Sequence, residues 1–186
     1  MQNAVRAAGT AALLLAVSTL PLLAAERIWF VPWKVLAPGA TPEDALFVVY
    51  WIPASPDDLK RSDLVTSRSL AIYSSRCVAM HVVRVDDVER LDRFGRPDLP
   101  VALVVDGERE LARLSGAVRS SDVEAMVRAE FDTREARANQ ALDDARDCLR
   151  EGDRTRAARL YESVARQRCS FPRQAKEAAR ALRRLK

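Results

Sequence analysis

Histidine, cysteine and glycine are scarce in this chain of 186 residues. An ordinary four-ligand zinc site would use nearly all of the single histidine, His81, and the three cysteines, so we expect no structural zinc. The six glycines fit no P-loop, no dinucleotide-binding fingerprint and no calcium loop. The sequence therefore predicts neither a metal ion nor a nucleotide cofactor.

The remaining composition is that of a folded protein. Apolar residues make up 48% and charged residues 30%, which suits a globular core and argues against disorder over the whole chain. The length fits one full domain with an appendage, or two very small domains. Basic residues are almost all arginine, with only four lysines, a bias that indicates a GC-rich bacterial genome.

Charge is absent from Ala7 to Ala25, after the positive Arg6. A leucine-rich centre and the small pair Ala24-Ala25 complete the pattern of a secretory signal, so residues 1–25 are predicted to be a signal peptide. The expected location is periplasmic or secreted. Because the uncharged stretch is nearly long enough to cross a bilayer, the alternative is an uncleaved segment that anchors the protein to the inner membrane.

Acidic residues are scarce at the C-terminal end. Residues 154–186 carry eleven basic side chains and only Glu162 and Glu177 as acids, a net charge of +9. This end is interpreted either as a solvated helix surface or as a surface that contacts an anionic envelope component. No aromatic residues alternate with the arginines to form a stacking platform, and the chain is predicted to be exported, so we expect no nucleic-acid partner.

Apolar runs and turn signals predict an α/β fold with a mixed sheet. Continuous apolar runs, rich in β-branched residues, are typical of strands buried on both faces. Helices are predicted between them, and Ser121 with Glu124 is interpreted as a capping box. Strands are expected at 45–52, 77–85, 101–105 and 108–114, an interrupted extended segment at 28–36, a helix at 56–75, a short helix or turn at 86–94, and a hairpin turn at Asp106-Gly107.

The ordered set of motifs over residues 45–131 resembles a thioredoxin-like domain. Tyr50-Trp51 lies where that family has an aromatic pair at the end of its central strand. Leu99-Pro100, followed by the 101–105 strand and the hairpin turn, is similar to the family's cis-proline, strand and hairpin. The resemblance implies a thioredoxin-like domain at residues 26–131, with a mixed sheet flanked by helices.

The resemblance does not extend to the disulfide-exchange chemistry of the family. That chemistry needs a thiolate at a helix N-terminus and a second, resolving thiol. The two corresponding positions fall at about Ser55 and Asp58, and the family's buried carboxylate falls at Val49. All three groups are missing together, so the resemblance implies a fold that is retained for its shape and not for disulfide exchange.

A binding groove could survive the loss of the thiols. In this family the loop before the cis-proline pairs with an extended peptide by strand addition. The corresponding groove here would be formed by Trp51, Ser55, Asp58, Leu99 and Pro100. The alternative is structural: Pro100 shapes the loop and Trp51 fills the core.

Residues 132–186 are predicted to form a helical extension, with breaks at Gly152-Asp153 and Phe171-Pro172. The sequence around the first break resembles one tetratricopeptide-type helical hairpin. A generic three-helix extension packed on the sheet domain is the alternative. The pattern also leaves open whether the first helix continues the one that starts at Ser121.

An odd number of cysteines leaves at least one thiol unpaired or linked between chains. Cys148 and Cys169 are the candidate disulfide because they lie closest in sequence. An antiparallel hairpin turning at Gly152 would nevertheless separate them beyond bridging distance. Cys77 is interpreted as a small buried apolar residue.

These observations predict an exported, redox-inactive thioredoxin-like protein that binds a protein or extended peptide, or serves as a scaffold, in the bacterial envelope. No catalytic residue is assigned. The alternative is a thiol–disulfide oxidoreductase or isomerase that uses a non-standard cysteine such as Cys77.

Overall fold

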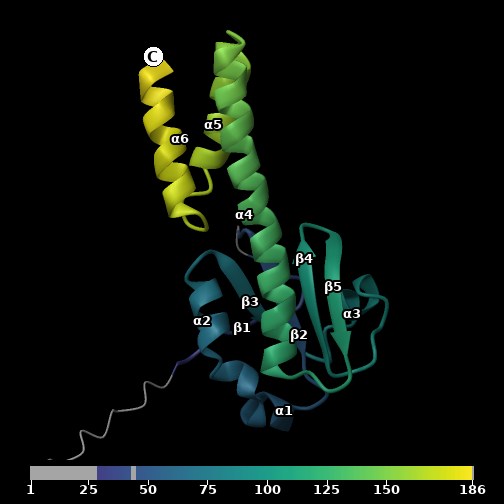
Figure 1. The fold of residues 1–186 in the computed structure, drawn as a ribbon. Coiled ribbons are helices and arrows are strands. Elements are labelled where there is room, and N and C mark those ends of the chain that lie inside the picture. Colours follow the sequence, from purple (N-terminus) through teal and green to yellow (C-terminus); the bar gives the residue numbers. More distant parts are fainter. Residues whose placement is uncertain (1–28, 43–44, 186) are drawn as a thin grey trace, which may run out of the picture.

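The computed structural model describes residues 29–42 and 45–185, so the predicted signal peptide lies outside the described residues. These residues form a mixed α/β structure with a C-terminal helical part, as the sequence predicts (Figure 1). The strands are β1 (Lys34–Val35), β2 (Phe47–Ile52), β3 (Val78–Val82), β4 (Val101–Asp106) and β5 (Arg109–Ser115). The helices are α1 (Pro56–Arg61), α2 (Arg68–Ser74), α3 (Val88–Arg93), α4 (Ser120–Arg150), α5 (Arg154–Ala165) and α6 (Pro172–Leu185), with a 3-10 turn at Asp63–Val65.

The five strands form one sheet in the order β1-β3-β2-β4-β5. β3 is parallel to both β1 and β2, whereas β4 runs antiparallel to β2 and to β5. The three apolar runs in the sequence become β2, β3 and β4, the three central strands. Their two covered faces explain why apolar residues follow one another without alternation.

Successive residues of each central strand point to opposite faces, so the sheet divides two hydrophobic clusters. Phe47, Val49 and Trp51 of β2 lie in the larger cluster, with residues of α2 and α4. Tyr50 and Ile52 lie in the smaller cluster, which includes Phe94 after α3. The aromatic pair Tyr50-Trp51 is therefore split across the sheet.

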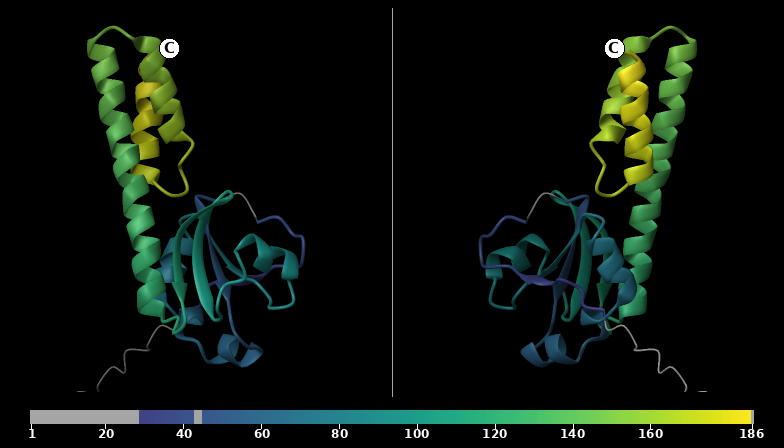
Figure 2. Two further views of the ribbon diagram at one scale, coloured as in Figure 1. Left: turned by 90° about the vertical axis from the view of Figure 1, so that its right-hand side faces the viewer. Right: turned by 90° about the vertical axis from the view of Figure 1, so that its left-hand side faces the viewer.

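Helix α4 joins the sheet to the C-terminal helices. It spans 31 residues, about 46 Å at the usual rise per residue, because neither glycine nor proline interrupts residues 117–151. Its first half covers one face of the sheet and its second half extends beyond the ends of the strands (Figure 2). The helix that starts near Ser121 thus continues through the C-terminal part, and the predicted boundary between residues 131 and 132 lies within it.

Helices α5 and α6 pack beside the projecting half of α4 (Figure 2). The turn before α5 contains Gly152, with a φ of 89°, and Asp153, whose side chain caps α5. Small buried residues on the three helices permit close packing: Ala138, Ala145, Ala157, Ala175 and Ala178. Arg146 of α4 pairs with Glu177 of α6. The loop between α5 and α6 turns back toward the sheet.

Two details of the predicted helices are wrong. The helix expected over 56–75 is divided into α1, the 3-10 turn and α2, because Ser62 and Ser67 each cap a new helical turn. The predicted capping box of Ser121 and Glu124 does not form: the residue before α4 is Arg119, which makes no side-chain cap. Glu124 instead accepts a hydrogen bond of 2.6 Å from the Ser67 hydroxyl.

The candidate disulfide between Cys148 and Cys169, which the hairpin geometry disfavours, does not form. Cys169, in the loop between α5 and α6, is bonded to Cys77, and Cys148 is a buried free thiol. The Cα atoms of Cys77 and Cys169 lie 5.9 Å apart. Cys148 cannot bond to Cys169, because it lies on the core-facing side of α4, one turn before Gly152. Cys77 is therefore a bridge between the sheet and the helical part, not a small buried apolar residue.

No helix within the described residues is both long enough and apolar enough to cross a membrane.

Candidate functional site

The predicted groove lies where β2 ends and β4 begins. Antiparallel pairing of these strands places Trp51 opposite Ala102 and Ile52 opposite Val101. Leu99 and Pro100, which are joined by a cis peptide bond, therefore lie beside the end of β2. After β2 the chain enters α1. The groove residues therefore come from three neighbouring segments at one end of the sheet: the end of β2, the start of α1 and the loop before β4.

Three of the five predicted residues line one cavity. Trp51, Asp58 and Pro100 border a cavity of about 330 Å³. The side chain of Trp51 is only 2% exposed and packs edge-on against Trp33 with ring centroids 5.6 Å apart, so it forms the floor of the cavity. The other lining residues, which the sequence analysis missed, are Arg61, Ser62, Asp63, Val118 and Arg119.

The charges around this cavity are balanced. Two carboxylates, Asp58 and Asp63, and two guanidinium groups, Arg61 and Arg119, contribute to the lining. Asp63 accepts hydrogen bonds from the backbone and the hydroxyl of Ser120, the latter 2.6 Å long. This contact fixes the N-terminal end of α4 against the 3-10 turn.

Ser55 and Asp58 are engaged in capping α1. The Ser55 hydroxyl accepts a hydrogen bond from the Asp58 backbone N–H at 3.3 Å, and the Asp58 carboxylate accepts one from the Ser55 backbone N–H at 2.9 Å. This reciprocal arrangement is a capping box. Both side chains are occupied with the local backbone, and the Asp58 carboxylate is bonded to the Ser55 backbone N–H and not to the Ser55 hydroxyl.

The capping role can be measured. Ser55→Ala should lower the free energy of unfolding by about 1 kcal/mol, because the Asp58 N–H loses its acceptor. Asp57→Asn is the matched control: Asp57 lies in the same turn but is exposed and has only a 3.8 Å contact with Lys60. Urea unfolding monitored by tryptophan fluorescence measures both. Equal effects of the two substitutions would contradict the capping role.

The remaining predicted residues do not line the Trp51 cavity. Ser55 borders a separate apolar cavity of about 400 Å³, whose lining includes Val35, Leu59 and residues 82–86, which begin at the last residue of β3. Leu99 is half-buried and packs against the smaller hydrophobic cluster. Thus α1 separates two cavities where the sequence predicts one continuous groove.

The only histidine and the neighbouring tyrosine lie inside the sheet. His81 is 1% exposed, and its ring centroid lies 6.1 Å from that of Tyr50 on β2. Burial raises the pKa of the Tyr50 hydroxyl, and the positive charges of Arg90 and Arg93 partly oppose this shift. His81 is buried within β3, one residue before Val82, and it lines neither cavity, which agrees with a structural residue.

A third cavity, which the sequence analysis missed altogether, lies at the opposite end of the sheet. It borders the Cys77–Cys169 disulfide. β2 and β3 are parallel and Cys77 precedes β3, whereas Pro100 lies beside the end of β2, so the length of the sheet separates the disulfide from the cis-proline. The sequence signals for this region were the odd cysteine count and the basic composition of residues 154–186.

No group of three or more potential metal ligands occurs within residues 29–42 and 45–185. The chain was also compared with protein-family models and with curated proteins, and no match was found in either comparison.

Proposed function

We propose that this protein is an exported, redox-inactive thioredoxin-like module that binds a protein or extended peptide in the bacterial envelope. The strand order β1-β3-β2-β4-β5, with β4 antiparallel to β2, supports the thioredoxin-like assignment. The cis peptide bond before Pro100 supports it further. Localisation in the envelope rests on the signal-like residues 1–25 of the sequence.

One observation carries the non-catalytic part of the proposal. The N-terminal turn of α1, where the family has its reactive thiols, holds Ser55 and Asp58 in a capping box. The disulfide of the described chain is at the other end of the sheet, and it joins two structural elements. A helix N-terminus occupied in this way offers a partner shape and hydrogen bonds but no thiolate chemistry.

The binding part of the proposal rests on the loop before β4. Within the described residues, the backbone N–H and C=O of Leu99 make no hydrogen bond, whereas the Pro100 carbonyl accepts one of 3.0 Å from Gly116. Free backbone groups beside a cavity are what an added strand of an extended peptide requires. The Trp51 cavity would then receive one side chain of that peptide.

The C-terminal helices extend the proposed scaffold. The antiparallel packing of α4, α5 and α6 with a glycine turn agrees with one tetratricopeptide-like hairpin and a following helix. The ten basic side chains of the described part of this region, Arg154 to Arg184, form no ion pair with a carboxylate of the described chain. Their charge remains available to an anionic envelope surface.

Site-specific photo-crosslinking tests the peptide-binding proposal. A photoreactive amino acid at Leu99 should crosslink a discrete partner in a bacterial envelope extract. The same amino acid at Arg109, the exposed first residue of β5, is the control and should not. Equal crosslinking at both positions, or none at Leu99, would remove the groove as a binding site.

One observation favours the alternative of a thiol–disulfide oxidoreductase. Cys169 is exposed, and Arg166, three residues before it, lines the same cavity. A nearby cation favours the thiolate form of a cysteine. Insulin reduction separates the two functions: we expect no turnover, and turnover that disappears in Cys77→Ser would establish the alternative.

A further inference from the structure

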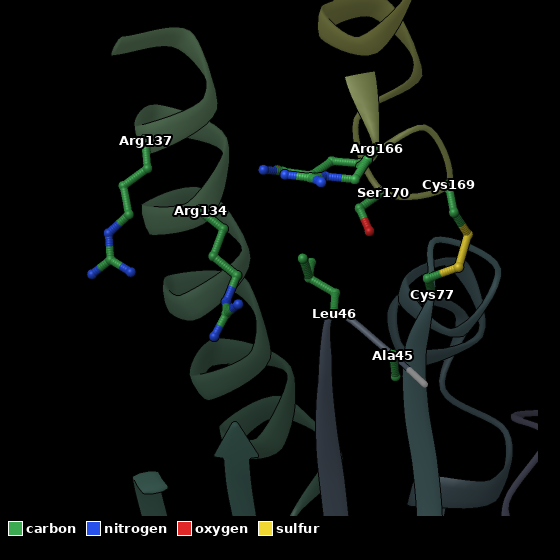
Figure 3. Close-up of a pocket in the computed structure, with 9 residues that line it drawn as sticks. Ala45, Leu46, Cys77, Arg134, Arg137, Arg166, Cys169 and Ser170 are labelled. Carbon is green, nitrogen blue, oxygen red and sulfur yellow. A yellow bond between two sulfur atoms is a disulfide. The ribbon is translucent and has the colours of Figure 1, made fainter. Parts of the chain in front are cut away.

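The cavity beside the disulfide has the features of an anion-binding site. Its volume of about 410 Å³ falls within the usual range of small-molecule pockets. Residues from four parts of the chain border it: the N-terminal ends of β2 and β3, the middle of α4 and the loop between α5 and α6 (Figure 3). Three arginines, Arg134, Arg137 and Arg166, contribute to the lining.

The three arginines are not equivalent. Arg134 is 15% exposed and is neutralised by Glu130 and Asp106, at 2.7 and 2.8 Å. Arg137 and Arg166 are exposed, and neither makes an ion pair or a side-chain hydrogen bond within the described residues. Two guanidinium groups from separate elements are therefore available to a ligand. Figure 3 shows Arg166 extending from the end of α5 toward α4.

A buried hydroxyl supplies an independent observation. Ser170 is only 3% exposed, yet its side chain has no hydrogen-bond partner in the described part of the chain. Its oxygen points into the space between Arg166 and Leu46 (Figure 3). This oxygen therefore lies at the surface of the cavity, where a bound ligand can form a hydrogen bond with it.

The loop that carries Ser170 is fixed before any ligand arrives. The Cys77–Cys169 disulfide holds the loop between α5 and α6 against the start of β3. Arg76 donates two hydrogen bonds to the Ser170 carbonyl, at 3.2 and 3.0 Å, and stacks 4.2 Å from the centre of the Phe131 ring. A preorganised site loses less conformational entropy on binding.

We propose that this cavity binds a phosphoryl group, either of a soluble phosphate ester or of a lipid headgroup. The two oxygens of a carboxylate accept a bidentate pair of hydrogen bonds from one guanidinium group. A phosphoryl group has at least three oxygens and a higher charge, so it can accept from Arg166 and the Ser170 hydroxyl together. Arg137, whose side chain points away from these two residues in Figure 3, adds positive charge to the lining. The apolar floor formed by Ala45 and Leu46 would contact the remainder of the ligand. This site is independent of the groove at Pro100.

Titration calorimetry of the oxidised protein with inorganic diphosphate at low salt tests the proposal. We expect one binding site that weakens about tenfold in Arg166→Gln and about fivefold in Ser170→Ala, since each loses a hydrogen bond to a charged group. Arg168→Gln is the matched control, because Arg168 carries the same charge two residues away but does not line the cavity. It should change the affinity less than twofold.

Three results would overturn the proposal. They are absence of diphosphate binding at about 1 mM, equal weakening by Arg166→Gln and Arg168→Gln, and equal affinity for succinate. Sedimentation with phosphatidylglycerol vesicles then identifies the source of the phosphoryl group. Vesicle binding that depends on Arg166 assigns it to a lipid headgroup, and diphosphate binding without vesicle binding assigns it to a soluble ester. Circular dichroism confirms that each variant is folded.

Discussion

Replacing both Cys77 and Cys169 with serine should lower the free energy of unfolding by about 2–5 kcal/mol. The disulfide closes a loop of 92 residues, and cross-linking so distant a pair restricts the unfolded chain strongly. It also joins the start of β3 to the loop that connects α5 with α6. The expected loss is therefore larger than for an exposed substitution elsewhere.

Chemical denaturation of the oxidised protein and the double variant measures this effect. Dithiothreitol supplies the internal control: it should shift the unfolding midpoint of the native protein toward that of the variant and leave the variant unchanged. If the native protein unfolds at the same denaturant concentration with and without the reductant, the disulfide does not contribute as described.

The local consequence of removing the disulfide can be followed separately. Besides the disulfide, the loop between α5 and α6 is held by Arg76, which bonds to Ser170, and by Phe171, whose ring lies 5.0 Å from that of Phe131. Amide exchange in residues 166–171 should therefore increase in the variant, while exchange in β4 should remain near its native value.

The central sheet was predictable because its signals are local. Continuous apolar runs identify β2, β3 and β4, and Asp106-Gly107 identifies the hairpin. The length of α4 was also readable in principle, because no glycine or proline interrupts residues 117–151. β1 falls within the extended segment expected at 28–36, but its bounds could not be read, since only Lys34 and Val35 pair and both are exposed.

The cysteine pairing could not be read from sequence distance. The pairing depends on two tertiary features. Helix α4 extends beyond the ends of the strands and positions α5 and α6 there, and the loop after α5 returns to the start of β3. One local signal was available for Cys148. It follows Ala138, Leu142 and Ala145 on the buried face of α4, a spacing that indicates a core thiol.

The groove was only partly predicted for a similar reason. Strand pairing correctly brings Trp51 and Pro100 to one sheet end. The sequence contains the capping signal of Ser55, but not the consequence that α1 divides the space into two cavities. The cavity beside the disulfide depends on the tertiary position of Arg166. The basic composition of residues 154–186 could therefore suggest only the charge of this cavity.

The second prediction with a large expected effect concerns a buried ion pair at α3, on the face of the sheet opposite α4. Arg90 of α3 lies 3.0 Å from the Asp87 carboxylate, and the two side chains are 7% and 1% exposed. Asp87 also caps α3 through the Arg90 backbone N–H at 3.2 Å, and Arg90 donates a 2.6 Å bond to the Ala40 carbonyl. The pair thus connects α3 to the loop that follows β1.

Asp87→Asn should lower the free energy of unfolding by about 3–5 kcal/mol, because it leaves the buried Arg90 cation without its counter-charge while an amide oxygen can still cap the helix. Asp86→Asn is the neighbouring control: its carboxylate pairs with Arg84 in solvent, so no measurable loss is expected. Urea denaturation at neutral pH measures both variants.

The double variant Asp87→Asn with Arg90→Met identifies the cause. If the loss comes from an uncompensated charge, removing Arg90 as well should recover more than half of the stability, because Met fills similar space without a charge. If the loss comes from the helix cap or from packing, the second substitution adds to the first. Only recovery in the double variant agrees with the electrostatic origin argued from the burial of both side chains.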